Sequence, residues 1–198
     1  TYLVNGIVTP QGGAPYSMAS AIDEQVLRSR FPATSSGGGA WVSEWLANDQ
    51  KLKGGDPITL KYFVVGSGRE LKQEETTLQV GAVVPMDSPV IDRSWTPDFP
   101  GVSEAENCRD WDPGIPMDMD AIRDQDEKYW DDYKGTPKVF IPLKKGQSMW
   151  QNRFGRLTTL RFSQEGRTEA QVTAGLLEKL RLRDIGLVTR NLGGAASA

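Results

Sequence analysis

The chain has 198 residues, a formal net charge of −3, 38% hydrophobic and 25% charged residues, which is typical of a globular protein of one domain or two small subdomains. It contains one cysteine and no histidine, which excludes an internal disulfide, zinc sites of the Cys/His type and every catalytic system with a histidine base. No run of about 18 apolar residues occurs, so the sequence predicts no membrane-spanning helix.

The N-terminal region predicts a strand, a helix and a loop. Residues 2–8 (YLVNGIV) are rich in β-branched and aromatic residues, which favours a strand. We expect a helix from Ser17, as its N-cap, to about Arg30. Its apolar positions keep helical spacing: Met18, Ile22, Val26 and Leu27. The stretch 32–39 (PATSSGGG) predicts a mobile loop or linker.

The next region predicts a short helix followed by a small β-meander. Residues 40–49 (AWVSEWLAND) place Trp41 and Trp45 four residues apart on one helical face, and we interpret them as core rather than as a ligand cage. A strand is expected from Ile58 to Val65. A returning strand is predicted by apolar alternation at Leu78, Val80, Ala82 and Val84. Residues 56–85 therefore predict a small-barrel meander.

The middle of the chain is rich in proline, acids and aromatics. Residues 86–116 predict an ordered excursion rather than regular structure, held by Trp95, Phe99 and Trp111. We expect Asp118 to cap a helix over residues 119–133, ended by Gly135 and Pro137. The apolar face of this helix is Met119, Ile122, Tyr129, Trp130 and Tyr133.

The last third predicts alternating strands and helices. Residues 138–143 (KVFIPL), 157–163 (LTTLRFS) and 185–191 (IGLVTRN) read as strands, and 144–154 as a short helix. A longer helix is expected to begin at Thr168, which forms a capping-box pattern with Gln171. Its apolar stripe is Val172, Leu176, Leu177 and Leu180. This order indicates an α/β or α+β layer.

Charge is distributed unevenly along the chain. Residues 92–132 contain 13 acids and 4 bases, whereas residues 134–198 contain 4 acids and 12 bases. The two halves either bind separate charged partners or face each other. We favour the second interpretation, because opposite blocks that are adjacent in sequence tend to neutralise each other.

The density of carboxylates in the acidic helix raises the question of a metal site. A calcium loop beginning at Asp118 needs an oxygen ligand at its fifth position, Gly at its sixth and Glu at its twelfth, but these positions hold Ile122, Arg123 and Tyr129. One helical surface still gathers four carboxylates at the spacing needed to collect a weakly bound divalent cation: Asp120, Asp124, Glu127 and Asp131. Because Arg123 and Lys128 are interleaved with them, a solvated face is the favoured interpretation.

Motifs of other chemistry are absent. Residues 66–71 (GSGREL) break the dinucleotide-binding glycine pattern and precede no helix. No phosphate loop or nucleophile elbow occurs, and no carboxylate pair is singled out as a glycosidase acid and base. The pI of about 5.1 argues against nucleic-acid binding. The residues therefore indicate a non-enzymatic binding or mechanical module, with no catalytic, cofactor-binding or metal-binding residue assigned.

Three stretches together resemble a known family. Residues 41–65 (WVSEWLANDQKLKGGDPITLKYFVV) with 78–85 (LQVGAVVP) are similar to a β-rich subdomain of FtsX-like ABC transporter permeases, in their MacB-like periplasmic core domain. Residues 105–162, from AENCRDWDPGIP through YKGTPKVFIPL to GRLTTLRF, resemble one large-permease branch of this family. Residues 157–191 resemble the second half of the porter-like subdomain of the family.

The resemblance implies an α+β fold in two parts. Residues 1–32 with 134–198 would form a porter-like α+β layer built from both chain ends. Residues 33–133 would form an inserted β-rich small subdomain, with the acidic aromatic-rich excursion and its connecting helix. We expect this helix to be the joint between the two parts, packed against residues 138–190.

The resemblance also implies a function and a location. The chain is expected to be an excised fragment of a membrane protein, lying on the extracytoplasmic (periplasmic) face of the cytoplasmic membrane. It would couple cytoplasmic ATP-driven motion to substrate or partner handling, without covalent chemistry. Its expected partners are its own transmembrane helices, a second permease subunit and, indirectly, the ATPase. The alternative is a stand-alone extracellular binding module for sugar, peptide or calcium. The transported substrate is left open.

Overall fold

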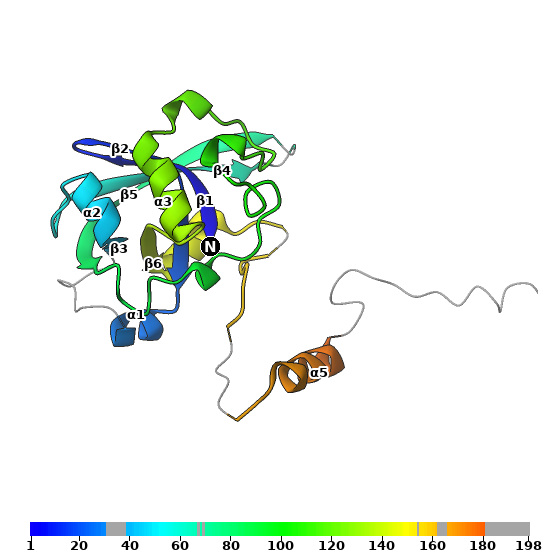
Figure 1. The fold of residues 1–198 in the computed structure, drawn as a ribbon. Coiled ribbons are helices and arrows are strands. Elements are labelled where there is room, and N and C mark those ends of the chain that lie inside the picture. Colours follow the sequence, from blue (N-terminus) through cyan, green and yellow to red (C-terminus); the bar gives the residue numbers. More distant parts are fainter. Residues whose placement is uncertain (31–38, 67, 69, 154, 162–165, 181–198) are drawn as a thin grey trace, which may run out of the picture. The chain divides into compact units, whose positions relative to one another are not determined.

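The structure, a computed structural model, describes residues 1–30, 39–66, 68, 70–153, 155–161 and 166–180. The chain divides into two compact units, Thr1–Thr159 and Leu160–Ala198. The described part of the second unit contains helix α5 (Glu169–Lys179). The first unit contains the strands and the other described helices (Figure 1).

In the first unit, strands dominate the N-terminal half and short helices follow them. The strands are β1 (Tyr2–Thr9), β2 (Gly12–Ile22), β3 (Ala40–Ser43), β4 (Pro57–Val65), β5 (Leu71–Val84) and β6 (Val139–Pro142). The α-helices are α1 (Glu24–Arg30), α2 (Glu44–Asp49), α3 (Asp124–Tyr133) and α4 (Leu143–Trp150). Three 3-10 turns lie between β5 and α3: η1 (Arg93–Trp95), η2 (Cys108–Asp110) and η3 (Met119–Ala121).

The strands of the described residues close into a barrel in the order β1-β2-β6-β3-β5-β4. The β2–β6 and β3–β5 pairs are parallel, and the other pairs are antiparallel. Strands β1, β2 and β6 come from the ranges 1–32 and 134–198, whereas β3, β4 and β5 come from 33–133. The barrel is therefore built equally from both ranges.

Alternation along the strands divides the apolar side chains between the barrel interior and its outer wall. Val139 and Ile141 point into the interior cluster, whereas Phe140 between them packs outside. In the same way, Val4 is interior and Leu3 is outside. Two outer clusters result, one against β1 and β2 and one against β2, β3, β5 and β6.

Short helices close both ends of the barrel. Helix α2 follows β3 and places Leu46 and Ala47 in the interior cluster, with Ser43 accepting the Leu46 N–H as N-cap. Helix α4 follows β6 and contributes Met149 and Trp150 to the same cluster. Because β3 and β6 are antiparallel, the two helices lie at opposite ends.

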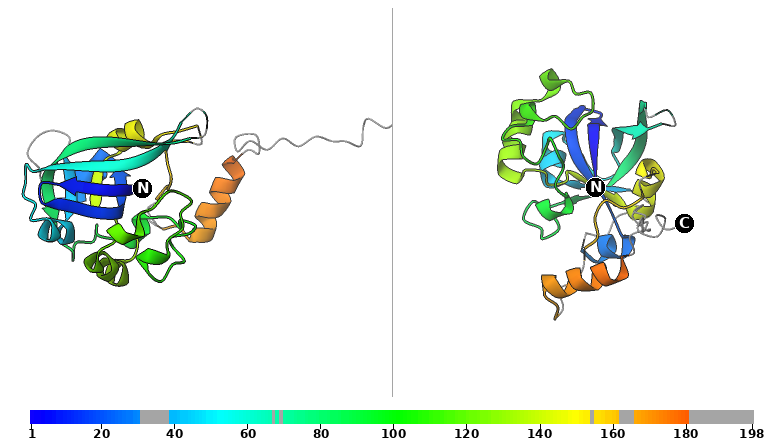
Figure 2. Two further views of the ribbon diagram at one scale, coloured as in Figure 1. Left: turned by 90° about the horizontal axis from the view of Figure 1, so that it is seen from above. Right: turned by 90° about the vertical axis from the view of Figure 1, so that its right-hand side faces the viewer.

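The segment between β5 and β6 covers one side of the barrel. It contains the 3-10 turns and α3, and the views of Figures 1 and 2 agree that it lies beside the outer wall. Its apolar side chains pack on Leu3 and Met18 of β1 and β2. The predicted ordered excursion is confirmed: Trp111 is buried, Phe99 packs beside it, and the Trp95 indole donates to the carbonyl of Val90.

Several predicted elements are confirmed: the strand over residues 2–8, the strand from Ile58, the returning strand to Val84, the strand 139–142 and the helix capped by Thr168 and Gln171. The predicted helix from Ser17 is wrong. Residues 12–22 are β2, which pairs with β1 on one edge and β6 on the other, and the helix runs only from Glu24 to Arg30. Pairing on both edges overrode the helical spacing.

The other differences are local. Trp41 lies in strand β3 and the helix begins only at Glu44, so Trp41 and Trp45 do not share a helical face. Asp118 caps the 3-10 turn η3, and α3 begins at Asp124. No strand occurs among the described residues 157–161. The loop at 32–39 lies outside the described residues except for Gly39, and so does the predicted strand 185–191.

The fold is α+β in the loose sense of helices packed around a mixed, closed sheet. Among the described helices, none combines the length and the apolar character needed to cross a membrane.

Candidate functional site

A buried lysine marks the most unusual site in the described residues. Lys138 precedes β6, where its backbone N–H donates to the carbonyl of Met18 and its carbonyl accepts from Ser43. Val139 points into the barrel, so alternation directs Lys138 to the outer wall beneath α3. The residue is only 3% exposed, a burial that lysine almost never reaches without a partner.

The partner of this lysine is Asp126 on α3, itself 5% exposed. The Lys138 Nζ lies 3.1 Å from Asp126 Oδ1. Arg123 approaches the same carboxylate in a two-point arrangement, with Nε 2.7 Å from Oδ2 and Nη2 2.9 Å from Oδ1. The Arg123 backbone N–H also donates to Oδ2 at 3.3 Å, as in one half of a capping box. Asp126 is therefore fully hydrogen-bonded.

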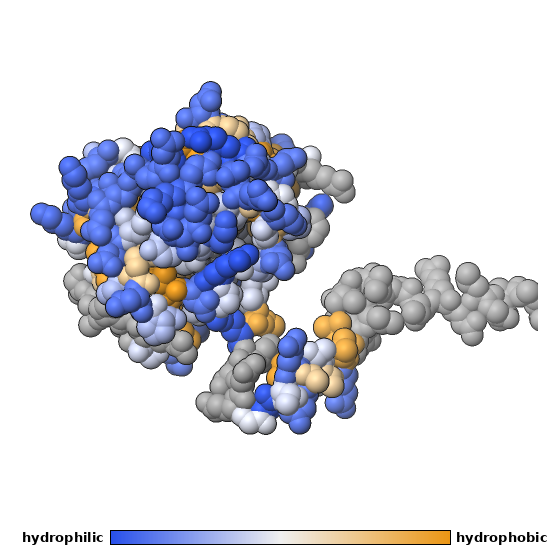
Figure 3. Space-filling model, in the orientation of Figure 1, coloured by the Kyte–Doolittle hydropathy of each residue, from blue (hydrophilic) through white to orange (hydrophobic). Residues whose placement is uncertain are grey.

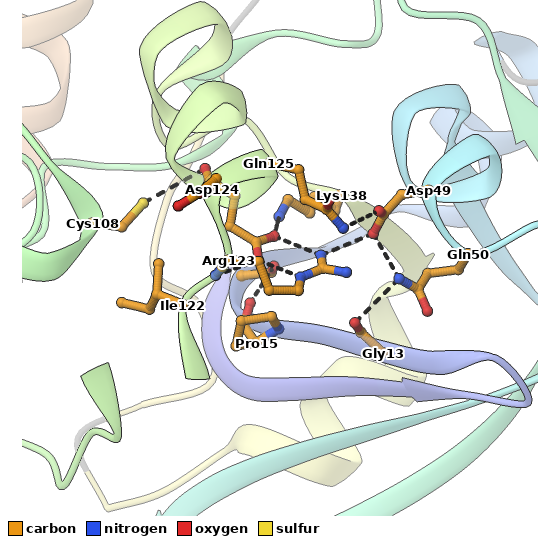
Figure 4. A network of polar contacts seen from close by, with 12 residues as sticks. Gly13, Pro15, Asp49, Gln50, Cys108, Ile122, Arg123, Asp124, Gln125 and Lys138 are labelled. Atoms are coloured by element: carbon orange, nitrogen blue, oxygen red, sulfur yellow. Dashed lines mark hydrogen bonds and ion pairs between the residues drawn. The ribbon is translucent and has the colours of Figure 1, made fainter. Parts of the chain in front are cut away.

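The network continues from Arg123 to Asp49, the last residue of α2. Arg123 Nη2 donates to Asp49 Oδ2 at 2.9 Å, and Gln125 Nε2 donates to Asp49 Oδ1 at 2.6 Å. Gln50, which is buried, donates to Asp49 and to the carbonyl of Gly13. Figure 4 shows these side chains converging between α3, α2 and the β1–β2 turn. One polar chain thus ties the acidic excursion to the barrel.

Burial and pairing act in opposite directions on the ionisable groups. Burial raises the pKa of Asp126, but the hydrogen bonds and charges of Arg123 and Lys138 outweigh it and hold the pKa below its ordinary value. Burial lowers the pKa of the Lys138 amine, and the Asp126 charge offsets only part of this effect. The two acids and two bases of the network balance in charge, which a buried ionic cluster requires.

The ammonium of Lys138 lies close to two aromatic rings. Its Nζ lies 4.3 Å from the ring centroid of Trp45 and 4.6 Å from that of Tyr129, within the range of cation–π attraction. The two rings lie 4.7 Å apart and Tyr133 packs against Tyr129. The interpretation of Trp41 and Trp45 as core rather than ligand cage is confirmed, because Trp41 is buried and Trp45 packs against the interior cluster.

A cavity of about 20 Å³ adjoins this network. Its lining includes Asp126, Lys138, Cys108, Trp111 and Lys134, from α3, the excursion and the segment before β6. A cavity of this size has room for ordered water. The indole N–H of Trp111 has no hydrogen-bond partner in the described residues, although Trp111 is only 5% exposed.

The thiol of Cys108 lies against the same cavity and is buried. Burial raises its pKa to about 12, and the nearby Glu127 carboxylate adds to the rise. A thiol in this environment carries almost no thiolate at neutral pH and is a poor nucleophile or metal ligand.

The structure separates the carboxylates that the sequence places on one helical surface. Asp120 lies in η3, before α3 begins. Asp124 and Glu127 both pair with Arg109, and Glu127 also accepts the backbone N–H of Cys108. Asp131 is exposed. No group of three carboxylate or cysteine side chains within the described ranges is arranged to hold a metal ion.

The predicted local pairing of the interleaved bases is confirmed. Arg123 pairs with Asp126 three residues on, and Lys128 with Asp132 four residues on. The ion pair of Lys138 with Asp126 joins the basic C-terminal region to the acidic segment. Figure 3 shows that the surface over α3 is nevertheless predominantly hydrophilic.

The predicted packing of the acidic helix is also confirmed. Tyr129 and Trp130 are buried, and α3 contacts Lys138 at the start of β6. Sequence reasoning missed the roles of Lys138 and Asp49. The available signal was the position of Lys138 directly before an uninterrupted apolar strand, VFI, where a charged residue must find a counter-charge.

The comparisons with known proteins add no relative. No family model matches the chain, and no curated protein matches it closely enough to be counted as related.

Proposed function

We propose that this chain is the extracytoplasmic domain of an FtsX-like ABC transporter permease, of the MacB-like periplasmic core type. It couples movement driven by a cytoplasmic ATPase to the handling of a substrate or partner protein outside the membrane. It performs no covalent chemistry. The starting point is the resemblance of residues 41–65, 78–85 and 105–162 to this family.

The observation that carries the proposal is the way in which the most family-like stretch, 105–162, is built into the fold. It runs from the excursion through α3 and β6 into α4. The ion pairs of Asp126 with Lys138 and of Arg123 with Asp49 lock it to the barrel. While these pairs are closed, a displacement of the stretch is passed on to the barrel, and removing one partner of a buried ion pair costs about 3–5 kcal/mol.

The chemistry of the site favours mechanical over catalytic work. The amine of Lys138 is buried and paired with Asp126, so it is not presented to a substrate. The carboxylate of Asp126 is saturated by donors from the chain itself. The buried Cys108 is unreactive at neutral pH.

The proposal also includes a porter-like layer and a set of membrane partners. The porter-like layer would draw a helix from α5 in the unit Leu160–Ala198. The partners would be the permease's own transmembrane helices, a second permease subunit and, indirectly, the ATPase.

A stand-alone binding module for sugar, peptide or calcium is the second candidate, and the exposed carboxylates of Asp120, Asp124 and Asp131 favour it. Calorimetric titration with Ca²⁺ and binding to a glycan and peptide panel test it. No heat from calcium and no bound glycan or peptide would remove its support.

The permease proposal is tested on the complete gene product. Its open reading frame should encode apolar spans on both sides of residues 1–198, and the full-length protein should copurify with an ATPase whose hydrolysis it modulates. A reading frame without such spans, or a full-length protein that binds no ATPase, would contradict the proposal.

A further inference from the structure

The excursion leaves the barrel and returns to it at a single point. The hydroxyl of Thr96 donates to the carbonyl of Gly135 at 2.6 Å, so the two ends of the segment 97–134 are tied together. A segment whose ends meet has one place about which it can turn, as in compact surface loops with close ends. We call residues 97–134 the lid.

The lid has internal contacts of its own. Glu127 on α3 accepts the backbone N–H of Cys108 at 2.9 Å, and the indole of Trp130 donates to the carbonyl of Ala105 at 3.2 Å. The rings of Trp111 and Trp130 meet edge to face with centroids 4.9 Å apart. A segment crosslinked in this way opens as one cooperative unit rather than by fraying.

Unfavourable features cluster where the lid meets the barrel. The cavity is lined by Trp111, whose indole N–H has no partner in the described residues, and by the buried ion pair of Lys138 with Asp126. Lys134 lines it too and has φ +51°, ψ −138°, a backbone conformation that costs a non-glycine residue about 1–3 kcal/mol. Lys134 is next to Gly135, at the point where the lid ends.

Such violations of local rules gather at places where a protein moves or binds. We propose that the lid, residues 97–134, swings away from the barrel wall as one unit about Thr96 and Gly135, and that the pairs Asp126–Lys138 and Arg123–Asp49 form the catch that holds it shut. Opening uncovers Leu3 and Met18 on the barrel together with Cys108 and Trp111 on the lid. This device is independent of the proposed transport role.

The catch is suited to reversible closure. Lys138 and Asp49 belong to the barrel side, whereas Arg123 and Asp126 belong to the lid. The pairs between the two sides are ionic and hydrogen-bonded, and their partners can return to water when the lid opens, which lowers the cost of the open state. The apolar contacts that must also separate are those of Leu3 and Met18 with their cluster and the ring contact of Trp45 with Tyr129.

Two readouts follow opening directly. Cys108 is the sole cysteine and is 5% exposed, so its modification by a thiol reagent reports the open lid. Hydrogen exchange measured by mass spectrometry separates peptides of the lid from peptides of β1, β2 and β4. We expect lid amides to exchange together and faster than barrel amides. We also expect the free energy of the opening that exposes Cys108 to fall less steeply with urea concentration than the free energy of global unfolding, because opening exposes less surface.

The variants are Lys138→Met and Asp49→Asn, with Lys128→Met as the matched control. Lys128 is exposed on α3 and pairs with Asp132 on the same helix. Lys138→Met should accelerate lid exchange and Cys108 labelling by about tenfold or more, and lid amides should still exchange before barrel amides. Asp49→Asn keeps the Lys138–Asp126 pair. It should therefore accelerate lid exchange and Cys108 labelling less than Lys138→Met does. Lys128→Met should match wild type within about twofold.

Contrary results are equally clear. If lid and barrel amides exchange at the same rate in the wild type, the lid is not a separate unit. If Lys138→Met leaves lid exchange and Cys108 labelling at the wild-type rates, or fails to fold while Asp49→Asn leaves lid exchange at the wild-type rate, the catch is overturned. Neither result bears on the membrane-topology test of the permease proposal, so the two failures are distinguishable.

Discussion

The ammonium of Lys138 lies 3.1 Å from the carboxylate of Asp126, and both residues are at most 5% exposed. The pair joins the excursion to the first residue before β6, and through Arg123 it reaches Asp49 at the end of α2. Asp126 and its partner Arg123 therefore connect three elements that are distant in sequence, namely α3, the start of β6 and the end of α2.

Asp126→Asn should destabilise the fold by about 3–5 kcal/mol, because it leaves Lys138 buried without its counter-charge. Asp131→Asn is the control, since Asp131 is exposed on the same helix and its substitution should change the free energy of unfolding by about 0.5 kcal/mol or less. Urea unfolding followed by circular dichroism measures both. Equal stability of the two variants would contradict the importance of the buried pair.

Stability should fall in acid because of this carboxylate. The folded-state pKa of Asp126 lies below its ordinary value, so between the two pKa values the unfolded chain binds more protons than the folded chain. The contribution of Asp126 is therefore complete above the ordinary pKa of about 3.9 and is lost as pH falls through the folded pKa. Urea unfolding from neutral to acidic pH should show the gap between wild type and Asp126→Asn closing. A constant gap would argue against a charged Asp126.

Cys108 should resist thiol reagents in the native protein. With a pKa raised to about 12 by burial, its thiolate fraction at pH 8 is roughly a thousandfold below that of an exposed thiol. Absorbance after addition of an aromatic disulfide reagent should rise slowly in buffer and at once in concentrated denaturant, to one thiol per chain. Complete reaction within seconds in native buffer would show that Cys108 is not buried.

Lys134→Gly should cost little or stabilise the fold, because glycine tolerates the positive φ of +51° at this position. The control is Lys128→Gly inside α3, where glycine should cost about 1 kcal/mol. Thermal or urea unfolding compares the two. A larger loss for Lys134→Gly than for Lys128→Gly would mean that its conformation is not strained.

Gly146→Ala should be destabilising by about 1–3 kcal/mol through overpacking. A Cβ at Gly146 would lie 2.2 Å from the Cβ of Ala21, where α4 packs on β2. Gly175→Ala in α5 is the control, since nothing lies within 4 Å of its added Cβ and alanine should favour the helix. Unfolding measurements give the change in the stability of the barrel, and far-UV circular dichroism gives the change in helix content. A neutral Gly146→Ala would show that α4 packs more loosely.

Part of the fold could be predicted from the sequence because the signals were local. Strand β4 and the returning strand to Val84 follow from β-branched alternation, and the helix after Thr168 from its capping box. The prediction of a helix from Ser17 was wrong because small residues such as Ala19 and Ser20 satisfy helical and strand patterns alike. Only pairing with β1 and β6, which is long-range, decides between them.

The candidate site was less predictable. The pairing of Arg123 with Asp126 follows from their spacing of three residues. Lys138 and Asp49 come from different elements, and no sequence pattern indicates that they meet the same helix. The cation–π contacts of Lys138 with Trp45 and Tyr129 likewise arise only from tertiary contact.

The most direct test of the permease proposal is a topology measurement on the full-length protein in the cells that make it. Asp131→Cys introduces an exposed thiol on α3, while the buried Cys108 serves as an internal blank. A membrane-impermeant maleimide applied to intact spheroplasts should label Asp131→Cys more strongly than the wild type by about one thiol per chain. Labelling that appears only after the membrane is permeabilised would place this domain in the cytoplasm and contradict the account.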